Sequence, residues 1–99
     1  MTVDEYTIYT NGETKSVQAW ISPDEHGGFW VTVSRLPGCV SQGDTIEEAK
    51  SNIAEALRGL VEFYHDNGLD VPWSDPGPKP HPLALEIRIR IVMPKKEGE

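Results

Sequence analysis

Carboxylates are the side chains of this 99-residue sequence that could support metal-dependent hydrolysis. Such a reaction needs several acids that converge around two ions roughly 4 Å apart. Asp4 falls in a segment with strand character, Asp24 in a turn-forming stretch and Asp44 directly before a helical pattern. Glu86 is expected on the opposite side of the sheet from Asp4. Because the acids are dispersed in this way, we predict neither a metal site nor a catalytic centre built from carboxylates.

Nucleophilic catalysis is the second chemistry to consider, because the sequence contains one cysteine, Cys39, and three histidines. A reactive thiolate needs a base and a positive environment, and apart from Arg35 the charges nearest to Cys39 are acidic. His26, His65 and His81 lie in a turn, at a helix end and in a proline-rich stretch, without the short spacing typical of metal ligands. We therefore interpret Cys39 as a small, partly buried residue, and we expect no enzymatic activity and no cofactor.

Three segments with alternating or β-favouring residues precede the cysteine and predict antiparallel strands. Residues 3–10 and 15–22 flank Asn11-Gly12, a pair typical of the tight turn of a β-hairpin. A stretch with a proline, acids and paired glycines can reverse the chain before the third run, residues 28–34.

A helix is predicted over residues 46–66, where apolar residues recur at steps of three and four. Thr45 and Glu48 form a capping-box pattern at its start, and Gly68 suits the left-handed position after its end. The apolar stripe, which must lie on the sheet, consists of Ile46, Ala49, Ile53, Ala56, Leu57, Leu60 and Tyr64.

The last third of the chain holds a connector and a final strand. Residues 72–82 contain five prolines in eleven positions, which is typical of an extended, semi-stiff linker. Residues 83–92 then alternate strictly and predict a strand. The tail, residues 94–99, should fray.

The predicted elements follow a β-β-β-α-β order, which indicates a single α+β domain over residues 1–93, with one helix packed on one face of a four-stranded sheet. Crossovers of a helix over a sheet are right-handed, so we expect the last strand to lie parallel to residues 3–10 and beside them. Counted along the sequence, the expected sheet order is 3-2-1-4.

The stretch RLPGCVSQGDTIEE, residues 35–48, joins the third strand to the helix. Pro37 disfavours further strand pairing, and Gly38 and Gly43 permit unusual backbone angles. Asp44 complements the helix N-terminus. A phosphate cradle is the alternative, because a glycine-rich turn before a helix presents free N–H groups. No lysine follows the glycines and two acids lie at the mouth, so we interpret the stretch as a structural joint.

The sheet face opposite the helix is predicted to carry aromatic residues and arginines, which dominate binding energies at protein interfaces. The candidate protein-binding residues are Tyr9, Trp20, Trp30, Arg88 and Arg90. The two tryptophans could instead pair with each other across adjacent strands, or the proline-rich connector could fold back over them with Trp73. We expect an interface, occupied by a second copy of the chain or by another protein.

The charge balance restricts the class of partner, because nine Lys and Arg stand against sixteen Asp and Glu, a formal net charge of −7. Such a surface repels nucleic-acid backbones and favours basic partners, although the same charge also keeps a small protein soluble. A single cysteine precludes an internal disulfide, and neither a leader nor an apolar stretch of about 20 residues is apparent. Cytoplasmic residence without membrane contact is therefore expected.

The stretch GGFWVTVSRLPGCVSQGDTIEEAKSNIAEAL, residues 27–57, resembles the signature of the HicB-type antitoxins. In that family a strand with paired glycines and an aromatic residue leads to a Leu-Pro-Gly-Cys loop, a Gln-Gly-Asp-Thr turn and a Glu-Glu-Ala helix start. The similarity runs from about residue 22 to residue 60. It implies a partial RNase H-like fold and a protein that neutralises a small basic HicA-type toxin, an mRNA-cleaving ribonuclease.

Two features differ from the family pattern. Ser34-Arg35 stands where Pro-Asp is common, and no ribbon-helix-helix or helix-turn-helix module follows, so we expect no direct DNA binding. The leading interpretation is an antitoxin that binds its toxin by protein contact and forms a homodimer or higher homo-oligomer. The alternatives are a degenerate RNase H-like, metal-dependent nuclease and a homo-oligomeric module with an unidentified partner.

Overall fold

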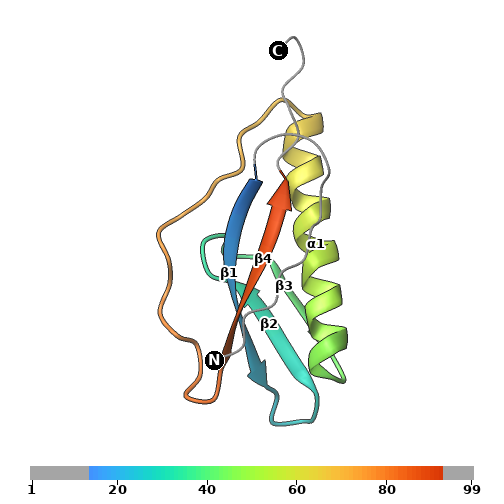
Figure 1. The fold of residues 1–99 in the computed structure, drawn as a ribbon, viewed down its shortest axis with the longest axis vertical. Coiled ribbons are helices and arrows are strands. Elements are labelled where there is room, and N and C mark those ends of the chain that lie inside the picture. The colour runs from blue at the N-terminus through green and yellow to red at the C-terminus, as the bar shows by residue number, and fades with distance from the viewer. Residues whose placement is uncertain (1–13, 93–99) are drawn as a thin grey trace.

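The computed structural model describes residues 14–92, which form a four-stranded sheet and one long helix (Figure 1). The sheet order is β3-β2-β1-β4, and every neighbouring pair of strands is antiparallel. This arrangement confirms the predicted mixed α+β class. The elements are β1 (Thr14–Pro23), β2 (Phe29–Val33), β3 (Val40–Gly43), α1 (Ile46–Asp66) and β4 (Leu85–Val92).

The neighbour of the last strand differs from the prediction. β4 pairs directly with β1 in a ladder that runs from Thr14↔Val92 to Ile21↔Leu85, so the predicted insertion of residues 3–10 between these two strands is wrong. Residues 3–10 themselves lie outside the described part of the chain. The observed order β3-β2-β1-β4 has the same numerals as the predicted order 3-2-1-4, but the predicted numbering counted residues 3–10 as the first strand and did not include β3. β4 reaches this edge of β1 because the proline-rich connector returns from the end of α1 to the start of β4, which lets β4 pair antiparallel with β1.

β3 is the strand that the sequence patterns do not predict, because its VSQG sequence is short and contains one β-favouring residue. The turn that precedes it is held by backbone bonds: the Cys39 N–H donates to the Leu36 carbonyl (3.0 Å) and the Val33 N–H to the Cys39 carbonyl (3.1 Å). Gly38 has a φ of +94°, in the left-handed region that favours glycine. The Leu-Pro-Gly-Cys stretch is therefore the turn of a β2–β3 hairpin and not a direct passage to the helix.

α1 begins and ends where the sequence predicts. The Glu48 N–H donates to Thr45 Oγ1 (3.0 Å), and the Asp44 N–H donates to Glu48 Oε1 (2.9 Å). Gly68 follows the C-terminal cap with a φ of +68°. These contacts satisfy backbone groups that a helix leaves unpaired at its ends.

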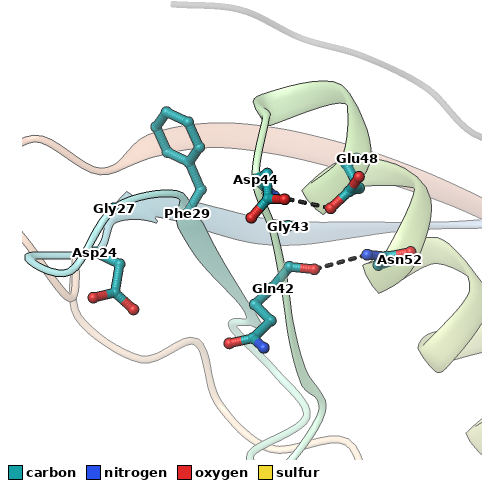
Figure 2. A pocket seen from close by; sticks show the side chains of 8 residues that line it. All are labelled: Asp24, Gly27, Phe29, Gln42, Gly43, Asp44, Glu48 and Asn52. Atoms are coloured by element: carbon teal, nitrogen blue, oxygen red, sulfur yellow. Dashed lines mark hydrogen bonds between the residues drawn. The ribbon is translucent and has the colours of Figure 1, made fainter.

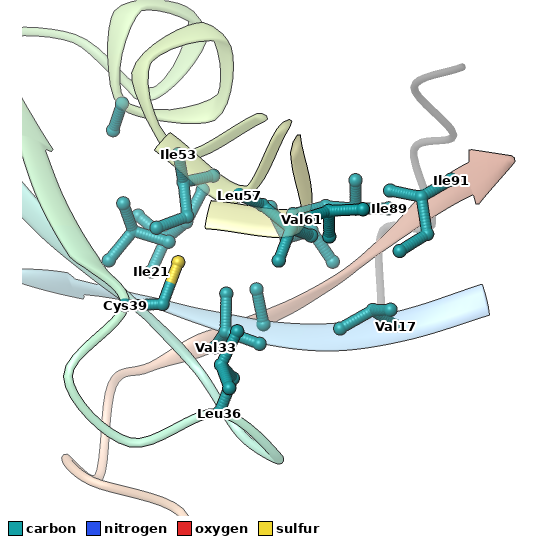
Figure 3. Close-up of a cluster of buried hydrophobic side chains, with 14 residues drawn as sticks. Val17, Ile21, Val33, Leu36, Cys39, Ile53, Leu57, Val61, Ile89 and Ile91 are labelled. Atoms are coloured by element: carbon teal, nitrogen blue, oxygen red, sulfur yellow. The ribbon is translucent and has the colours of Figure 1, made fainter. Parts of the chain in front are cut away.

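The core lies between α1 and the sheet (Figure 3). Alternate residues of β1, β2 and β4 point toward the helix, as strand periodicity predicts. Two strand positions on the helix side are peripheral: Leu85 is 42% exposed and Phe29 is half-buried. The buried cluster consists of Val17, Ala19, Ile21, Val31, Val33, Leu36, Cys39, Ala49, Ile53, Leu57, Val61, Ile87, Ile89 and Ile91.

The hairpin and the helix approach each other most closely at Gly43. A Cβ atom at this position would lie 2.5 Å from the backbone nitrogen of Ala49. At Gly28, where φ is +76°, a Cβ atom would lie 2.9 Å from the Gly43 carbonyl oxygen. Close packing between β2, β3 and α1 therefore requires glycine at both positions.

Candidate functional site

The sheet face that points away from α1, called the outer face below, holds the described candidate protein-binding residues. Ala19, Ile21 and Val31 pack in the core, so their sequence neighbours Trp20 and Trp30 point to the other side. Cross-strand pairing extends this face over all four strands. The outer face consists of Ser16, Gln18, Trp20, Ser22, Trp30, Thr32, Val40, Gln42, Glu86, Arg88 and Arg90.

The two tryptophans occupy diagonal positions of adjacent strands. Trp20 lies opposite Thr32, and Trp30 lies opposite Ser22. Diagonal positions are about 7 to 8 Å apart, within reach of aromatic side chains. Both indoles are half-buried. The strand register thus places them on one surface, as predicted, but neither is fully exposed.

Charged side chains line the β4 side of the outer face. Gln18 Nε2 donates to Glu86 Oε2 (2.6 Å), and the Arg88 guanidinium lies 3.5 Å from the same oxygen. The Glu86 side chain is 15% exposed and that of Arg88 is 47% exposed. The carboxylate is therefore satisfied within the sheet, whereas the guanidinium reaches solvent. Arg90 is also exposed, and Tyr9 lies outside the described residues, so the binding role of this set stays a prediction.

Two buried polar atoms of the outer face have no hydrogen-bond partner in the protein: Trp20 Nε1 and Ser22 Oγ. Ser22 is 0% exposed, although α1 lies on the other side of the sheet. Most buried polar groups are paired, and an unpaired one costs about 1 to 3 kcal/mol. These two polar groups of the outer face are therefore shielded from solvent, and the protein offers them no hydrogen bond in exchange.

Contacts between the β2–β3 turn and the proline-rich segment, residues 69–84, are absent from the sequence-based expectations. The Ser74 N–H donates to the Arg35 carbonyl (2.8 Å), and Arg35 Nε donates to the Ser74 carbonyl (2.8 Å). The Gly77 N–H donates to Ser34 Oγ (3.1 Å). We call these bonds the Ser34–Arg35 clamp. Its two residues on the turn are the positions that differ from the Pro-Asp common in the family pattern, but that difference does not identify residues 74–77 as their partners.

A pocket of about 350 Å³ lies at the start of α1 (Figure 2). Asn52 Nδ2 donates to the Gln42 carbonyl (2.7 Å), which ties α1 to β3, and Glu48 accepts from the Asp44 N–H. Because these groups serve the connection between hairpin and helix, they support the structural-joint interpretation over a phosphate cradle. The pocket is lined by Asp24, Gly27, Phe29, Gln42, Gly43, Asp44, Glu48 and Asn52.

Candidates for nucleophilic or metal chemistry do not come together in the described region. Burial raises the pKa of the Cys39 thiol to about 11, and this residue is 2% exposed, so the thiol is protonated at neutral pH. Among residues 14–92, no three His, Cys, Asp or Glu side chains are placed to hold a metal ion, and Asp4 lies outside this range. The same stretch contains no helix that is both long and apolar enough for a membrane crossing.

Comparisons with known proteins extend the sequence resemblance. Antitoxin HicB 1 from Photorhabdus laumondii subsp. laumondii is 38% identical over 74 residues, which are 74% of this chain and 48% of that protein. A UPF0150 protein from Thermoplasma acidophilum is 42% identical over 52 residues, 52% of this chain and 75% of the relative. Antitoxin HicB from Pseudomonas fluorescens is 27% identical over 64 residues, 65% of this chain and 44% of that protein. The chain thus spans about half the length of these HicB relatives.

A family model covers more of the fold than any short motif does. Residues 17–78 match the family described as HicB_like antitoxin of bacterial toxin-antitoxin system. The match includes the β2–β3 hairpin, α1 and both halves of the Ser34–Arg35 clamp, and it ends before β4. More than half of the chain is therefore explained by one family, and the chain belongs to the HicB-like antitoxins of bacterial toxin–antitoxin systems.

Proposed function

We propose that this chain is an antitoxin that binds a small basic HicA-type toxin, an mRNA-cleaving ribonuclease, and neutralises it by protein–protein contact, without catalysing a reaction itself. The observation that carries the proposal is the family match over residues 17–78. The net charge of −7 supports it, because charge complementarity accelerates encounter with a basic partner. Action in the cytoplasm, where mRNA is translated, is part of the proposal.

The outer face is the surface that we propose for toxin binding. Tryptophan and arginine are the residue types most enriched among those that contribute strongly to interfaces. Trp20, Trp30, Arg88 and Arg90 lie on this one face, and Tyr9 is proposed as a fifth member. α1 leaves the face free of helix, so a partner could dock on it without disturbing the core.

The oligomeric state and the fold assignment are also part of the proposal. We propose a homodimer or higher homo-oligomer, because symmetric self-association is the commonest outcome for soluble proteins, and no direct contact of this chain with DNA. A partial RNase H-like architecture is the fold assignment that the order β3-β2-β1-β4 with α1 on one face supports.

Growth rescue and binding test the proposal together. A candidate toxin, sought as a small basic protein encoded next to this chain's gene, is expressed with the wild-type chain, with a Trp20→Ala/Trp30→Ala variant, or with Phe63→Ala. Phe63 is an exposed aromatic residue of α1 and serves as a control. We expect rescue by the wild type and the control, and at least a 30-fold loss of affinity in the double variant. Circular dichroism confirms that each variant is folded.

An exposed site provides a second variant, since the half-buried indoles could also affect folding. Arg88→Glu should weaken toxin binding about 10-fold or more without changing the circular dichroism spectrum. Absence of any recovered basic protein together with absence of rescue would contradict the antitoxin function. If both outer-face variants bind with wild-type affinity, the toxin must bind a surface other than the outer face.

A further inference from the structure

We propose that the proline-rich segment, residues 69–84, is an intramolecular cover over part of the outer face, and that it must be displaced before a protein partner can reach Trp20. The cover is a property of the free chain. Its role as a gate for the toxin rests on the proposed function.

From Ser74 onward, the segment lies on the side of the sheet away from the helix. In Figure 1 the strands stand between α1 and this segment, which leaves the C-terminal end of α1 and returns to the start of β4. Ser34 directly follows β2, and its N–H donates to the Gln18 carbonyl (2.9 Å), which extends the pairing with β1 by one residue beside the outer-face residue Gln18. The Ser34 hydroxyl accepts the Gly77 N–H at 3.1 Å, which attaches the segment on that side.

The attachment is concentrated in the first half of the segment. Trp73 packs against the edge of the core rather than on the two outer tryptophans, and Lys15 Nζ lies 5.0 Å from the centroid of its ring. Ser74 then exchanges a reciprocal pair of bonds with Arg35, both 2.8 Å long. The Ser34–Arg35 clamp and the Trp73 anchor therefore hold one end of the cover, and β4 holds the other.

The rest of the segment bonds mainly to itself. His81 accepts the N–H groups of Leu83, through Nδ1, and of Ala84, through its carbonyl, both at 3.0 Å. Residues 75–80 are all exposed. A segment that is tied at its ends and loosely held between them can be released by breaking few bonds.

The unpaired atoms of the outer face show what the cover does. Trp20 Nε1 and Ser22 Oγ are buried without partners, and α1 cannot bury them because it lies on the opposite face. Besides cross-strand neighbours such as Trp30, the proline-rich segment is the described part of the chain on that side. A covered indole N–H without an acceptor gains a hydrogen bond when a partner replaces the cover, which favours exchange of one for the other.

The clamp would then set the apparent affinity of the site. When a binding-competent state is fractionally populated, the apparent dissociation constant rises in inverse proportion to that fraction. Weakening the clamp should increase the open fraction and tighten partner binding, although it removes contacts from the free protein.

Hydrogen exchange measured by NMR tests the cover in the isolated chain. The unclamped variant is Ser34→Ala/Arg35→Ala, and the matched control is Ser51→Ala/Arg58→Ala, which changes the same residue types at exposed positions of α1. We expect at least 10-fold faster exchange of the Trp20 indole N–H and of the Ser74 and Gly77 amides in the unclamped variant. The control and the amides of the β1–β4 ladder should exchange at wild-type rates.

A further variant is needed if the Trp73 anchor alone can hold the segment in place. If the Ser74 and Gly77 amides keep their wild-type rates, Trp73→Ala is added to remove the anchor. Faster exchange at Ser74 and Gly77 with an unchanged Trp20 indole overturns the proposal, as does an unchanged Trp20 indole in the triple variant.

The gating role needs a binding measurement with the adjacent basic protein as the probe. We expect the unclamped variant to bind it more tightly than the matched control, by a factor close to the change in Trp20 exchange. Faster exchange of the Trp20 indole with unchanged affinity would contradict the gating role for this partner, but it would remain consistent with the intramolecular cover. Absence of binding by the wild type contradicts the proposed function instead, so the two failures are distinguishable.

Discussion

The two faces of the sheet differ in how completely their side chains are packed and paired. On the face beneath α1, the residues of the core cluster are each at most 4% exposed, whereas the outer face combines half-buried tryptophans, an arginine in solvent and two unpaired polar atoms. Burial of apolar area is the dominant stabilising contribution in folding. The comparison indicates that the face beneath α1 maintains the fold and that the outer face, which packing leaves less complete, is the side available for recognition.

The largest effect should come from removing a central core residue. Leu57→Ala deletes a fully buried side chain of α1 and should lower the free energy of unfolding by about 2 to 5 kcal/mol. Thr32→Ala on the outer face should lower it by about 1 kcal/mol or less. Urea unfolding followed by circular dichroism measures both, and equal losses would remove the distinction between the faces.

A smaller loss is expected at the junction of hairpin and helix. Gly43→Ala would place a Cβ atom against the Ala49 backbone and should cost roughly 1 to 3 kcal/mol through overpacking. Gly59→Ala is the matched control, because a Cβ atom there meets nothing within 4 Å, and it should stabilise α1 by about 0.5 to 1 kcal/mol. Thermal unfolding of both variants checks the opposite signs.

The unpaired hydroxyl on the outer face gives a change of unusual sign. Ser22→Ala removes a buried oxygen without a partner and should raise the free energy of unfolding by up to about 1 kcal/mol. Ser34→Ala, in contrast, removes the hydroxyl that accepts the Gly77 N–H at 3.1 Å and leaves only the longer bond to the Ser34 carbonyl (3.4 Å). It should lower the free energy of unfolding by about 0.5 to 1.5 kcal/mol. A loss in the first variant, measured by urea unfolding, would mean that the Ser22 hydroxyl is paired in solution.

The smallest expected effect is a pH dependence of stability that comes from Cys39, a residue of the core cluster beneath α1. Burial raises the pKa of Cys39 to about 11 in the folded chain, so the unfolded state releases this proton first as pH rises. Stability should therefore fall above about pH 9, by roughly 0.5 kcal/mol near that pH. Cys39→Ala should lack this loss of stability. Urea midpoints of the wild type and the variant are each measured at pH 7 and at pH 9.5, and the larger decrease in the wild type gives the contribution of Cys39 apart from other titrating groups.

Local patterns predict the parts of this fold that local forces determine. The bounds of α1 follow from its periodicity and from Thr45 and Glu48 at its start, and strand alternation assigns Trp20 and Trp30 to the outer face. The neighbour of β4 depends on pairing between strands far apart in the sequence, and alternation identifies a strand without identifying its partner. The clamp joins Arg35 to a residue 39 positions away, for which no local signal exists.

The β1–β4 ladder has a consequence for synthesis. β1 lies near the beginning of the described chain and β4 at its end, yet they pair along eight positions. While the ribosome is still producing the proline-rich segment, the nascent chain can fold its hairpin and helix, but β1 keeps one open edge. Open strand edges invite pairing with other chains. Protection from such contacts therefore begins when β4 emerges.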